Sequence, residues 1–373
     1  MSKKVELEQL LTAAPNTIDL QQHNSVDALH YRLPTESCLG HLMASPKYSA
    51  TDLQHHNGRH FINITQSPWA PTAKAKLLKW VLLRKSNTWQ VDYQQALTER
   101  YSRMQSLPQN RPHANLDDWQ VWFVGHATVL LQIGRYNILT DPVWADYVSP
   151  KQGLGPKRAI PAGLALEQLP EIHAVLLSHN HYDHMDLATL NWLHQRFEMP
   201  IYTGLGNGYY LPKHFKVMEM DWWQSAIFKD LKIIYTPAQH GSGRGMRDEN
   251  AALWGAFCIQ TDQDYCYFAG DTGYADHFKD LHRRLGAPRL ALLPIGAYAP
   301  RELLRYMHMN PQDAFQAHLD LQAKRSLAIH YRSYQLTDEL RDQPEFDLQQ
   351  VLKNSSKLMG PFYCIQEGRK MIV

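Results

Sequence analysis

From Trp119 onwards the chain alternates short apolar runs with polar turns, a pattern typical of β-strands. Runs that are rich in β-branched and aromatic side chains predict strands at residues 120–124, 128–133, 136–140, 174–177, 201–203, 231–236, 253–259, 265–269, 290–294 and 326–329. Gly134 and Arg135 separate two of these runs, so they predict a tight hairpin turn.

Three segments between the predicted strands carry apolar residues at helical spacing. In the first, Leu187, Leu190, Leu193 and Phe197 recur on one side, and Asp186 stands where a helix cap is expected. Two further helices are predicted at residues 276–284 and 311–324. Strands that alternate with helices indicate an α/β fold built from layered, mixed sheets.

The first 115 residues differ from the rest in composition and in their pattern of apolar residues. They are rich in Gln, Asn, His and Pro and contain few apolar runs, so we expect residues 1–115 to form an extension that wraps a core domain at 116–373. Segment 74–85 combines Leu, Val and Trp with five basic residues. It predicts an amphipathic helix that either faces an anionic membrane surface or packs on the core with its lysines in solvent.

Composition and charge narrow the classes of protein to consider. With 44% hydrophobic and 20% charged residues, the chain can bury a large core and is not intrinsically disordered. Its net charge of +2 gives no general argument for nucleic-acid binding. Scattered cysteines, no secretory-type apolar segment and no apolar run of ~18 residues predict a cytoplasmic protein, which could contact the inner membrane face peripherally.

Four side chains with metal-binding chemistry follow the predicted strand that ends at Leu177. His179, His181, Asp183 and His184 place three imidazoles and a carboxylate within six residues. Because alternate residues of an extended chain point the same way, His179 and His181 can converge on one point. A turn would bring Asp183 and His184 to a second point. This set suits zinc or a comparable ion, whereas the alternative is a polar loop with solvated histidines.

Three other predicted strands each end in a further candidate ligand, namely His240, Asp271 or His330. Taken singly, each residue could be structural, because strand-end histidines often bond to the backbone and Asp271 lies in a turn-like Gly-Asp-Thr-Gly. Together, five His and two Asp suit two metal ions. We expect His179, His181 and His240 on one ion, Asp183, His184 and His330 on the other, and Asp271 between them.

Several motifs together resemble those of the metallo-β-lactamase superfamily and, more narrowly, its N-acyl-phosphatidylethanolamine-hydrolysing phospholipase D group. Besides His179–His184, the matching stretches are Trp122–Thr128, Leu139–Val143, Gly155–Arg158, Asp221–Trp223, Leu253–Gly255, Phe268–Tyr274, Pro294–Tyr298 and Ala323–His330. The resemblance departs at Gly241–Gly243, where the group has an aromatic residue, and at Met307, where it has Gln. Both departures put the identity of the lipid in doubt.

The resemblance implies an αβ/βα four-layer sandwich with two Zn²⁺ ions, held by the ligands assigned above. It also implies that a hydroxide shared by the ions attacks a phosphodiester, releasing phosphatidic acid and an N-acylethanolamine. Asp271 would take part in catalysis, Tyr182 and His308 would lie near the phosphate, and Asp141 would orient a ligand histidine. The partner would be a phospholipid rather than nucleic acid, and the oligomeric state, a homodimer included, is left open.

Other functions fit parts of this pattern. A lactonase or another ester hydrolase of the same superfamily would use the same metals, because a dinuclear site can serve the hydrolysis of a carboxylic ester as well as that of a phosphodiester. A non-catalytic binding protein on the same fold is a third hypothesis, which the intact ligand set disfavours. A redox di-iron site is disfavoured because His181 stands where that branch, by resemblance, carries a carboxylate.

Overall fold

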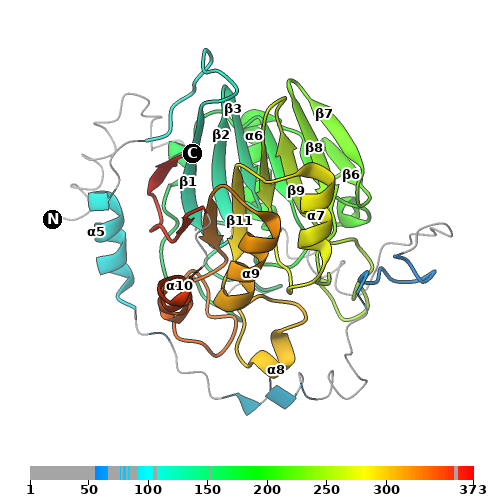
Figure 1. Cartoon of the computed structure of the whole chain (residues 1–373), viewed down its shortest axis with the longest axis vertical. Helices are drawn as coiled ribbons and strands as arrows, with labels where there is room; N and C mark the ends of the chain where they lie inside the picture. Colours follow the sequence, from blue (N-terminus) through cyan, green and yellow to red (C-terminus); the bar gives the residue numbers. More distant parts are fainter. Residues whose placement is uncertain are drawn as a thin grey trace.

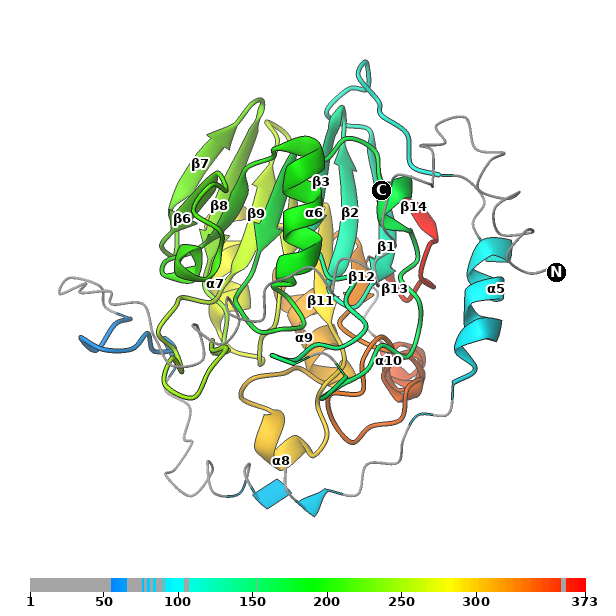
Figure 2. The ribbon, with the colours of Figure 1, turned by 180° about the vertical axis from the view of Figure 1, so that it is seen from behind.

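The computed structural model describes residues 55–65, 76, 79–80, 83–84, 89, 91–103, 107–151, 153–356 and 360–373. Within these residues, two seven-stranded sheets pack face to face and carry helices on their outer faces (Figures 1 and 2). The layers therefore follow the order helix, sheet, sheet, helix, and the predicted α/β sandwich with two mixed sheets is confirmed.

The first sheet has the strand order β14-β1-β2-β3-β4-β5-β6. Its strands are β1 (Trp119–Gly125), β2 (Thr128–Ile133), β3 (Tyr136–Thr140), β4 (Ala174–Leu177), β5 (Ile201–Gly204), β6 (Val217–Met220) and β14 (Lys370–Ile372). The pairs from β14 to β3 are antiparallel, and those from β3 to β6 are parallel. Helix α6 (Leu187–Phe197) covers the outer face of this sheet (Figure 2).

The second sheet has the order β13-β12-β11-β10-β9-β8-β7. Its strands are β7 (Ser225–Phe228), β8 (Leu231–Thr236), β9 (Ala256–Gln260), β10 (Tyr265–Phe268), β11 (Leu290–Pro294), β12 (Ser326–Ile329) and β13 (Phe362–Tyr363). Helices α7 (His277–Leu285) and α9 (Pro311–Leu321) lie on its outer face (Figure 1), and α10 (Gln343–Asn354) packs beside α9. The short α8 (Arg301–Leu304) precedes α9, and α5 (Tyr93–Arg103) precedes both sheets.

The side chains of β2 show how the pattern of the sequence builds these layers. Val129 and Leu131 belong to the core between the two sheets, whereas Leu130 belongs to the core beneath α6. All three are at most 1% exposed, because this strand is covered on both faces. On α6, Leu190 and Leu193 complete the second core.

The predicted elements are present, and the largest shifts of their ends, by three residues, occur in two places. The strand predicted at 253–259 begins at Ala256, because the backbone N–H of Leu253 bonds to the carbonyl of Leu205 instead of a strand partner. The helix predicted to run to residue 324 ends at Leu321, since Gln322 adopts a left-handed conformation with φ 50°. The expected cap is confirmed: the Asp186 carboxylate accepts hydrogen bonds from the backbone of Ala188 and Thr189.

The described parts of the first 115 residues lie along the rim of the sandwich in Figure 1, with segment 55–65 and α5 on opposite sides. Most of segment 74–85 lies outside the described residues; Lys76, Lys79, Trp80 and Leu83 in it are helical. The Trp80 indole donates to the Asp338 carboxylate, while Leu83 is 66% exposed. Membrane contact by this segment therefore stays a prediction. Among the described helices, none has the length and apolarity needed to cross a bilayer.

Candidate metal centre

All seven predicted ligands meet at one edge of the sandwich, where strands from both sheets end. The segment His179–His184 follows β4 of the first sheet, and His240, Asp271 and His330 follow β8, β10 and β12 of the second. Parallel strands deliver the residues that follow them to the same edge, which explains why positions far apart in sequence converge.

His179, His181 and His240 form the first set of candidate ligands. Nδ1 of His181 lies 2.8 Å from Nε2 of His179 and 3.2 Å from Nε2 of His240. Asn180 points elsewhere, since its Oδ1 accepts a hydrogen bond from the backbone of Gly243. Three imidazole nitrogens thus face a common point, as the alternation along the sequence predicts.

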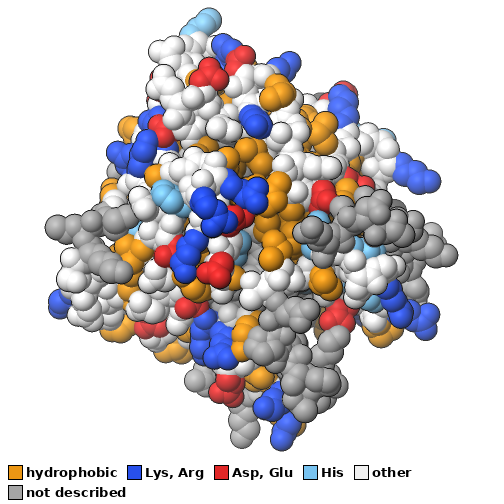
Figure 3. Space-filling view, turned by 45° about the vertical axis from the view of Figure 1, so that its right-hand side comes forward, with side chains coloured by type: hydrophobic (Ala, Val, Ile, Leu, Met, Phe, Trp, Pro, Cys, Tyr) orange, Lys and Arg blue, Asp and Glu red, His pale blue; other side chains and the backbone are white. Residues whose placement is uncertain are grey.

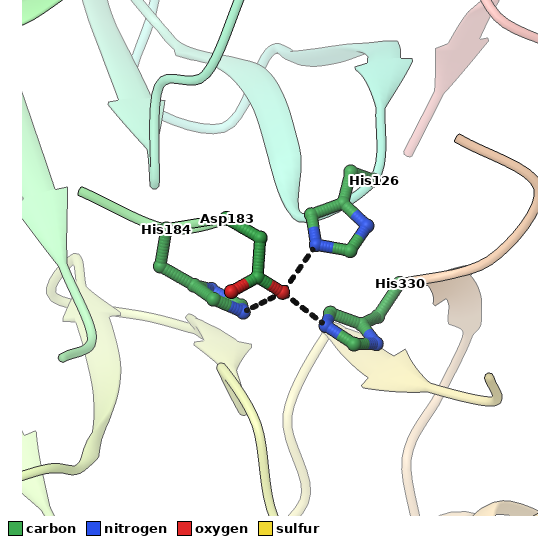
Figure 4. A group of neighbouring side chains, drawn as sticks. All are labelled: His126, Asp183, His184 and His330. Carbon is green, nitrogen blue, oxygen red and sulfur yellow. Dashed lines mark hydrogen bonds and ion pairs between the residues drawn. The ribbon is translucent and has the colours of Figure 1, made fainter. Parts of the chain in front are cut away.

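Asp183, His184 and His330 form the second set, which Figure 4 shows together with His126. Oδ2 of Asp183 lies 3.4 Å from Nε2 of His184 and 3.4 Å from Nε2 of His330. The two imidazole rings are nearly parallel, with an angle of 14° between their planes. This arrangement places one carboxylate oxygen and two nitrogens around a second point.

Asp271 lies between the two sets. Its Oδ2 is 3.2 Å from Nε2 of His184 and 3.7 Å from Nε2 of His240, while its Oδ1 is 3.1 Å from Nε2 of His330. The preceding Gly270 has φ +57°, and a Cβ there would lie 2.5 Å from the Cβ of Ser178. Glycine at this position therefore lets the strand end approach β4 and brings Asp271 among the histidines.

Asp141 orients a histidine of each set. Its Oδ2 accepts hydrogen bonds from Nδ1 of His184 (2.6 Å) and from Oγ of Ser178 (2.6 Å). The same Oγ lies 2.9 Å from Nδ1 of His179 and accepts that N–H. Both imidazoles are thereby fixed with Nδ1 as the donor of this hydrogen bond, so each turns its Nε2 toward the centre. Asp141 thus lies in the position expected of an orienting residue.

Burial and charge have opposite effects on the groups of the centre. Burial lowers the pKa of His181 to about 4 and the pKa of His240 to about 3, so both are neutral ligands at pH 7. Burial alone would raise the pKa of Asp271, but His184 and His330 hold it well below the usual range. Burial would likewise lower the pKa of His330, yet Asp271 and Asp183 raise it to about 9.

The residues fit a bound divalent cation. Nε2 of His184, Nε2 of His330 and Oδ1 of Asp271 are buried, and although they lie close to one another, none of them forms a hydrogen bond of acceptable geometry within the described part of the chain. Leaving such atoms without partners is costly, and a cation would satisfy all three. Imidazole and carboxylate donors of this kind suit zinc and similar first-row ions.

His308 and Tyr182, the two residues expected near substrate, occupy different surroundings. Nδ1 of His308 lies 3.7 Å from Oδ2 of Asp271, and burial lowers the pKa of His308 to about 3. The Tyr182 hydroxyl instead donates to the carbonyl of Arg244 (2.9 Å), whose guanidinium lies 3.9 Å above the Tyr182 ring. His308 therefore lies at the centre, while Tyr182 connects it to the loop that follows His240.

The sequence analysis gave no role to His126, which the structure places at the second set (Figure 4). Its Nε2 lies 3.0 Å from Oδ2 of Asp183, and its ring centroid is 4.1 Å from that of His330. His126, Asp141 and His330 all have positive φ, at 56°, 30° and 61°. Such strained residues gather at functional sites. A single His in the turn between two strands has no neighbouring His or Asp at a ligand-like spacing, so the sequence indicates His126 only through its place in the motif Trp122–Thr128.

A cavity of about 810 Å³ lies near the end of β8, and none of the seven predicted ligands is among the residues that line it. Ile62, Ile64, Trp222 and Trp223 contribute to its wall, together with Gln239, the neighbour of His240. Lys279, Arg283 and Arg284 of α7 also line it. Figure 3 shows exposed hydrophobic side chains in a hollow beside a group of Lys and Arg.

Clustered histidines and aspartates at the edge of such a sandwich define the class of metal-dependent hydrolases with the metallo-β-lactamase fold. The chain belongs to the beta-lactamase superfamily, whose domain model matches residues 136–331.

Its relatives include two proteins named as N-acyl-phosphatidylethanolamine-hydrolyzing phospholipases D. An uncharacterized protein of Mycobacterium tuberculosis is 39% identical over 223 residues, which cover 58% of this chain and 59% of the relative. N-acyl-phosphatidylethanolamine-hydrolyzing phospholipase D 1 of Caenorhabditis elegans is 34% identical over 254 residues, which cover 64% of this chain and 71% of the relative. The mitochondrial N-acyl-phosphatidylethanolamine-hydrolyzing phospholipase D of Saccharomyces cerevisiae is 34% identical over 62% of this chain and 51% of the relative. The matched region thus spans between half and three quarters of each relative.

Solved structures show the same fold at lower identity. Isothiocyanate hydrolase from Delia radicum gut bacteria superposes with a TM-score of 0.53 at 22% identity, over 68% of this chain and 98% of that one. A metallo hydrolase from Ignicoccus hospitalis gives a TM-score of 0.52 at 19% identity, over 69% and 98%. These likenesses concern the fold of the sandwich.

Proposed function

We propose that this protein is a dinuclear zinc-dependent phosphodiesterase that hydrolyses N-acyl-phosphatidylethanolamine or a related phospholipid in the manner of a phospholipase D. The observation that carries the proposal is the position of Asp271 between the two sets: its Oδ2 lies 3.7 Å from Nε2 of His240 in the first set and 3.2 Å from Nε2 of His184 in the second. The two N-acyl-phosphatidylethanolamine-hydrolyzing relatives, each 34% identical, support the choice of substrate.

Each set would hold one ion. His179, His181 and His240 would bind the first, Asp183, His184 and His330 the second, and Asp271 would bridge them. Two ions held by these residues would supply a water of lowered pKa and would neutralise charge on a phosphate ester. The protein contributes the fixed direction of its ligands, since Asp141 orients His184 directly and His179 through Ser178.

His308 would orient the reacting phosphate. Because its pKa is lowered to about 3, its imidazole is neutral at pH 7 and offers an N–H donor rather than an imidazolium charge. Its side chain is 14% exposed, more than those of His184, His240 and His330, which are at most 1% exposed. A neutral His donating to a phosphoryl or leaving oxygen would stabilise the charge that develops there.

The cavity near the end of β8 offers a surface for the apolar part of a lipid. Its wall combines Ile62, Ile64, Trp222 and Trp223, and the basic side chains of α7 border it. Apolar walls with a few charged groups are typical of sites for amphiphilic ligands. Approach from a membrane surface, through segment 74–85 or this face, is part of the proposal.

The test is a comparison of substrates with one purified, zinc-loaded preparation. N-acyl-phosphatidylethanolamine in vesicles, a soluble phosphodiester and a lactone are incubated in parallel, and the products are identified by mass spectrometry. The proposal predicts phosphatidic acid and an N-acylethanolamine from the vesicles. Rapid cleavage of the lactone with no lipid product would contradict it, as would cleavage of the soluble diester alone.

A further inference from the structure

Segment 55–65 contacts a metal-ligand residue directly through Asn63. The Asn63 Nδ2 donates to the carbonyl oxygen of His240 (2.8 Å), and the Asn63 Oδ1 accepts from the backbone N–H of His240 (3.1 Å). The same Oδ1 accepts from the indole N–H of Trp254 (3.1 Å). One side-chain amide thus binds both peptide groups of His240, as a neighbouring β-strand would.

The segment itself is anchored to the sandwich on either side of this contact. Phe61 is fully buried in the core, and its N–H bonds to the carbonyl of Asn250 (2.8 Å). The ring of His55 stacks on Trp222 at 4.3 Å, and the Gln239 side chain donates to the carbonyl of Thr65 (3.2 Å). These contacts on both sides of Asn63 therefore fix its position.

The contacts of His240 determine the direction of its imidazole. Its Nδ1 donates to the carbonyl of Met307 (2.8 Å), which leaves Nε2 facing His181 at 3.2 Å. The ring is thus fixed by Met307, while the backbone that carries it is fixed by Asn63. A shift of the backbone would move Nε2 away from the point on which the first ligand set converges.

We propose that Asn63 is a positioning residue for His240, and that segment 55–65 is consequently part of the metal centre. This segment lies outside residues 136–331, the part that the superfamily model matches. The inference rests on the proposed binding of metal by the first ligand set. It predicts that Asn63 influences the affinity for one ion, beyond any effect on the stability of the fold.

The experiment measures zinc affinity in wild type and in Asn63→Ala by competition with a chromophoric chelator. Asn57→Ala is the matched control, because the Asn57 Oδ1 accepts only from Arg59 and His60 of its own segment among the bonds the structure shows. We expect Asn63→Ala to bind one of its two zinc ions about 10- to 100-fold more weakly, the usual effect of losing a partner of a metal ligand. We expect Asn57→Ala to match the wild type.

Unchanged affinity for both ions in Asn63→Ala would overturn the inference, whatever lipid the wild type hydrolyses. An equal fall in the melting temperature of the metal-free and zinc-loaded forms would also overturn it, since that is the signature of a purely structural role. Should Asn63→Ala fail to fold, Asn63→Asp decides in the same way, because it keeps the acceptor and loses only the donor to His240. A wild type that binds zinc but spares lipid would contradict only the proposed substrate.

Discussion

The Oδ2 of Asp141 lies 2.6 Å from the Nδ1 of His184, and both side chains are completely buried. This contact fixes the tautomer of a ligand histidine, and through Ser178 the same carboxylate also fixes His179. A single carboxylate therefore fixes one imidazole in each proposed ligand set.

Replacing Asp141 by Asn tests this arrangement. The amide nitrogen would face either Nδ1–H of His184 and the hydroxyl of Ser178, or the backbone N–H of Ser178, so at least one hydrogen bond that holds the two histidines is lost in either orientation. We expect zinc affinity to fall about 10- to 100-fold, as measured by chelator competition. Asp248→Asn is the control, because this buried carboxylate accepts from Tyr210 and from Arg244 instead. Equal affinities in the two variants would contradict the role of Asp141.

Replacing His126 by Phe tests the residue that the sequence analysis overlooked. Phe keeps the ring volume but removes the contact between Nε2 and Oδ2 of Asp183, which is 3.0 Å long. A carboxylate without this partner is held less firmly, so we expect the second ion to dissociate about tenfold faster. Rapid mixing of the zinc-loaded variant with a chelator measures the rate. An unchanged rate would mean that Asp183 is fixed without His126.

Asp186 stabilises the start of α6 and the loop before it. Its carboxylate accepts from Ala188 and Thr189 of the helix and from the backbone N–H of Trp144 and Ala145. Loss of the cap and exposure of buried donors together predict a destabilisation of about 3 kcal/mol in Asp186→Ala. Urea unfolding of the metal-free protein measures it. Asp186→Asn, which keeps an acceptor oxygen, should lose less, and equal losses would show that the cap contributes little.

Ile64 tests the cavity as a lipid surface. It is 65% exposed in the wall of the cavity, whereas Ile227 is 72% exposed on the edge strand β7. We expect Ile64→Ser to raise the KM for vesicle substrate about fivefold, equivalent to roughly 1 kcal/mol of lost apolar contact. Turnover of a soluble phosphodiester should not change, and Ile227→Ser should behave as wild type. If both serine variants lower vesicle hydrolysis equally, the cavity has no special part in lipid binding.

The fold and the ligand set could be predicted from sequence because both rest on local patterns. Apolar runs predicted β2, β4 and β12, and the chemistry of the residues just after such runs pointed to His179, Asp271 and His330. Edge strands such as β6 were not predicted, because their side chains are largely exposed and do not alternate between apolar and polar.

Contacts that depend on distant parts of the chain could not be predicted in this way. His126 reaches Asp183 across 57 positions, and Asn63 reaches His240 across 177. A single His or Asn in a turn has no spacing that would indicate such a partner. The same limit applies to Tyr182, whose bond to the carbonyl of Arg244 depends on how the loop after His240 folds.

The most direct test of the central claim is anomalous X-ray diffraction at the zinc edge from crystals of the zinc-loaded protein. The account predicts two peaks per chain, one bounded by His179, His181 and His240 and one by Asp183, His184 and His330, with Asp271 between them. A single peak, or two peaks without Asp271 between them, would contradict the dinuclear centre.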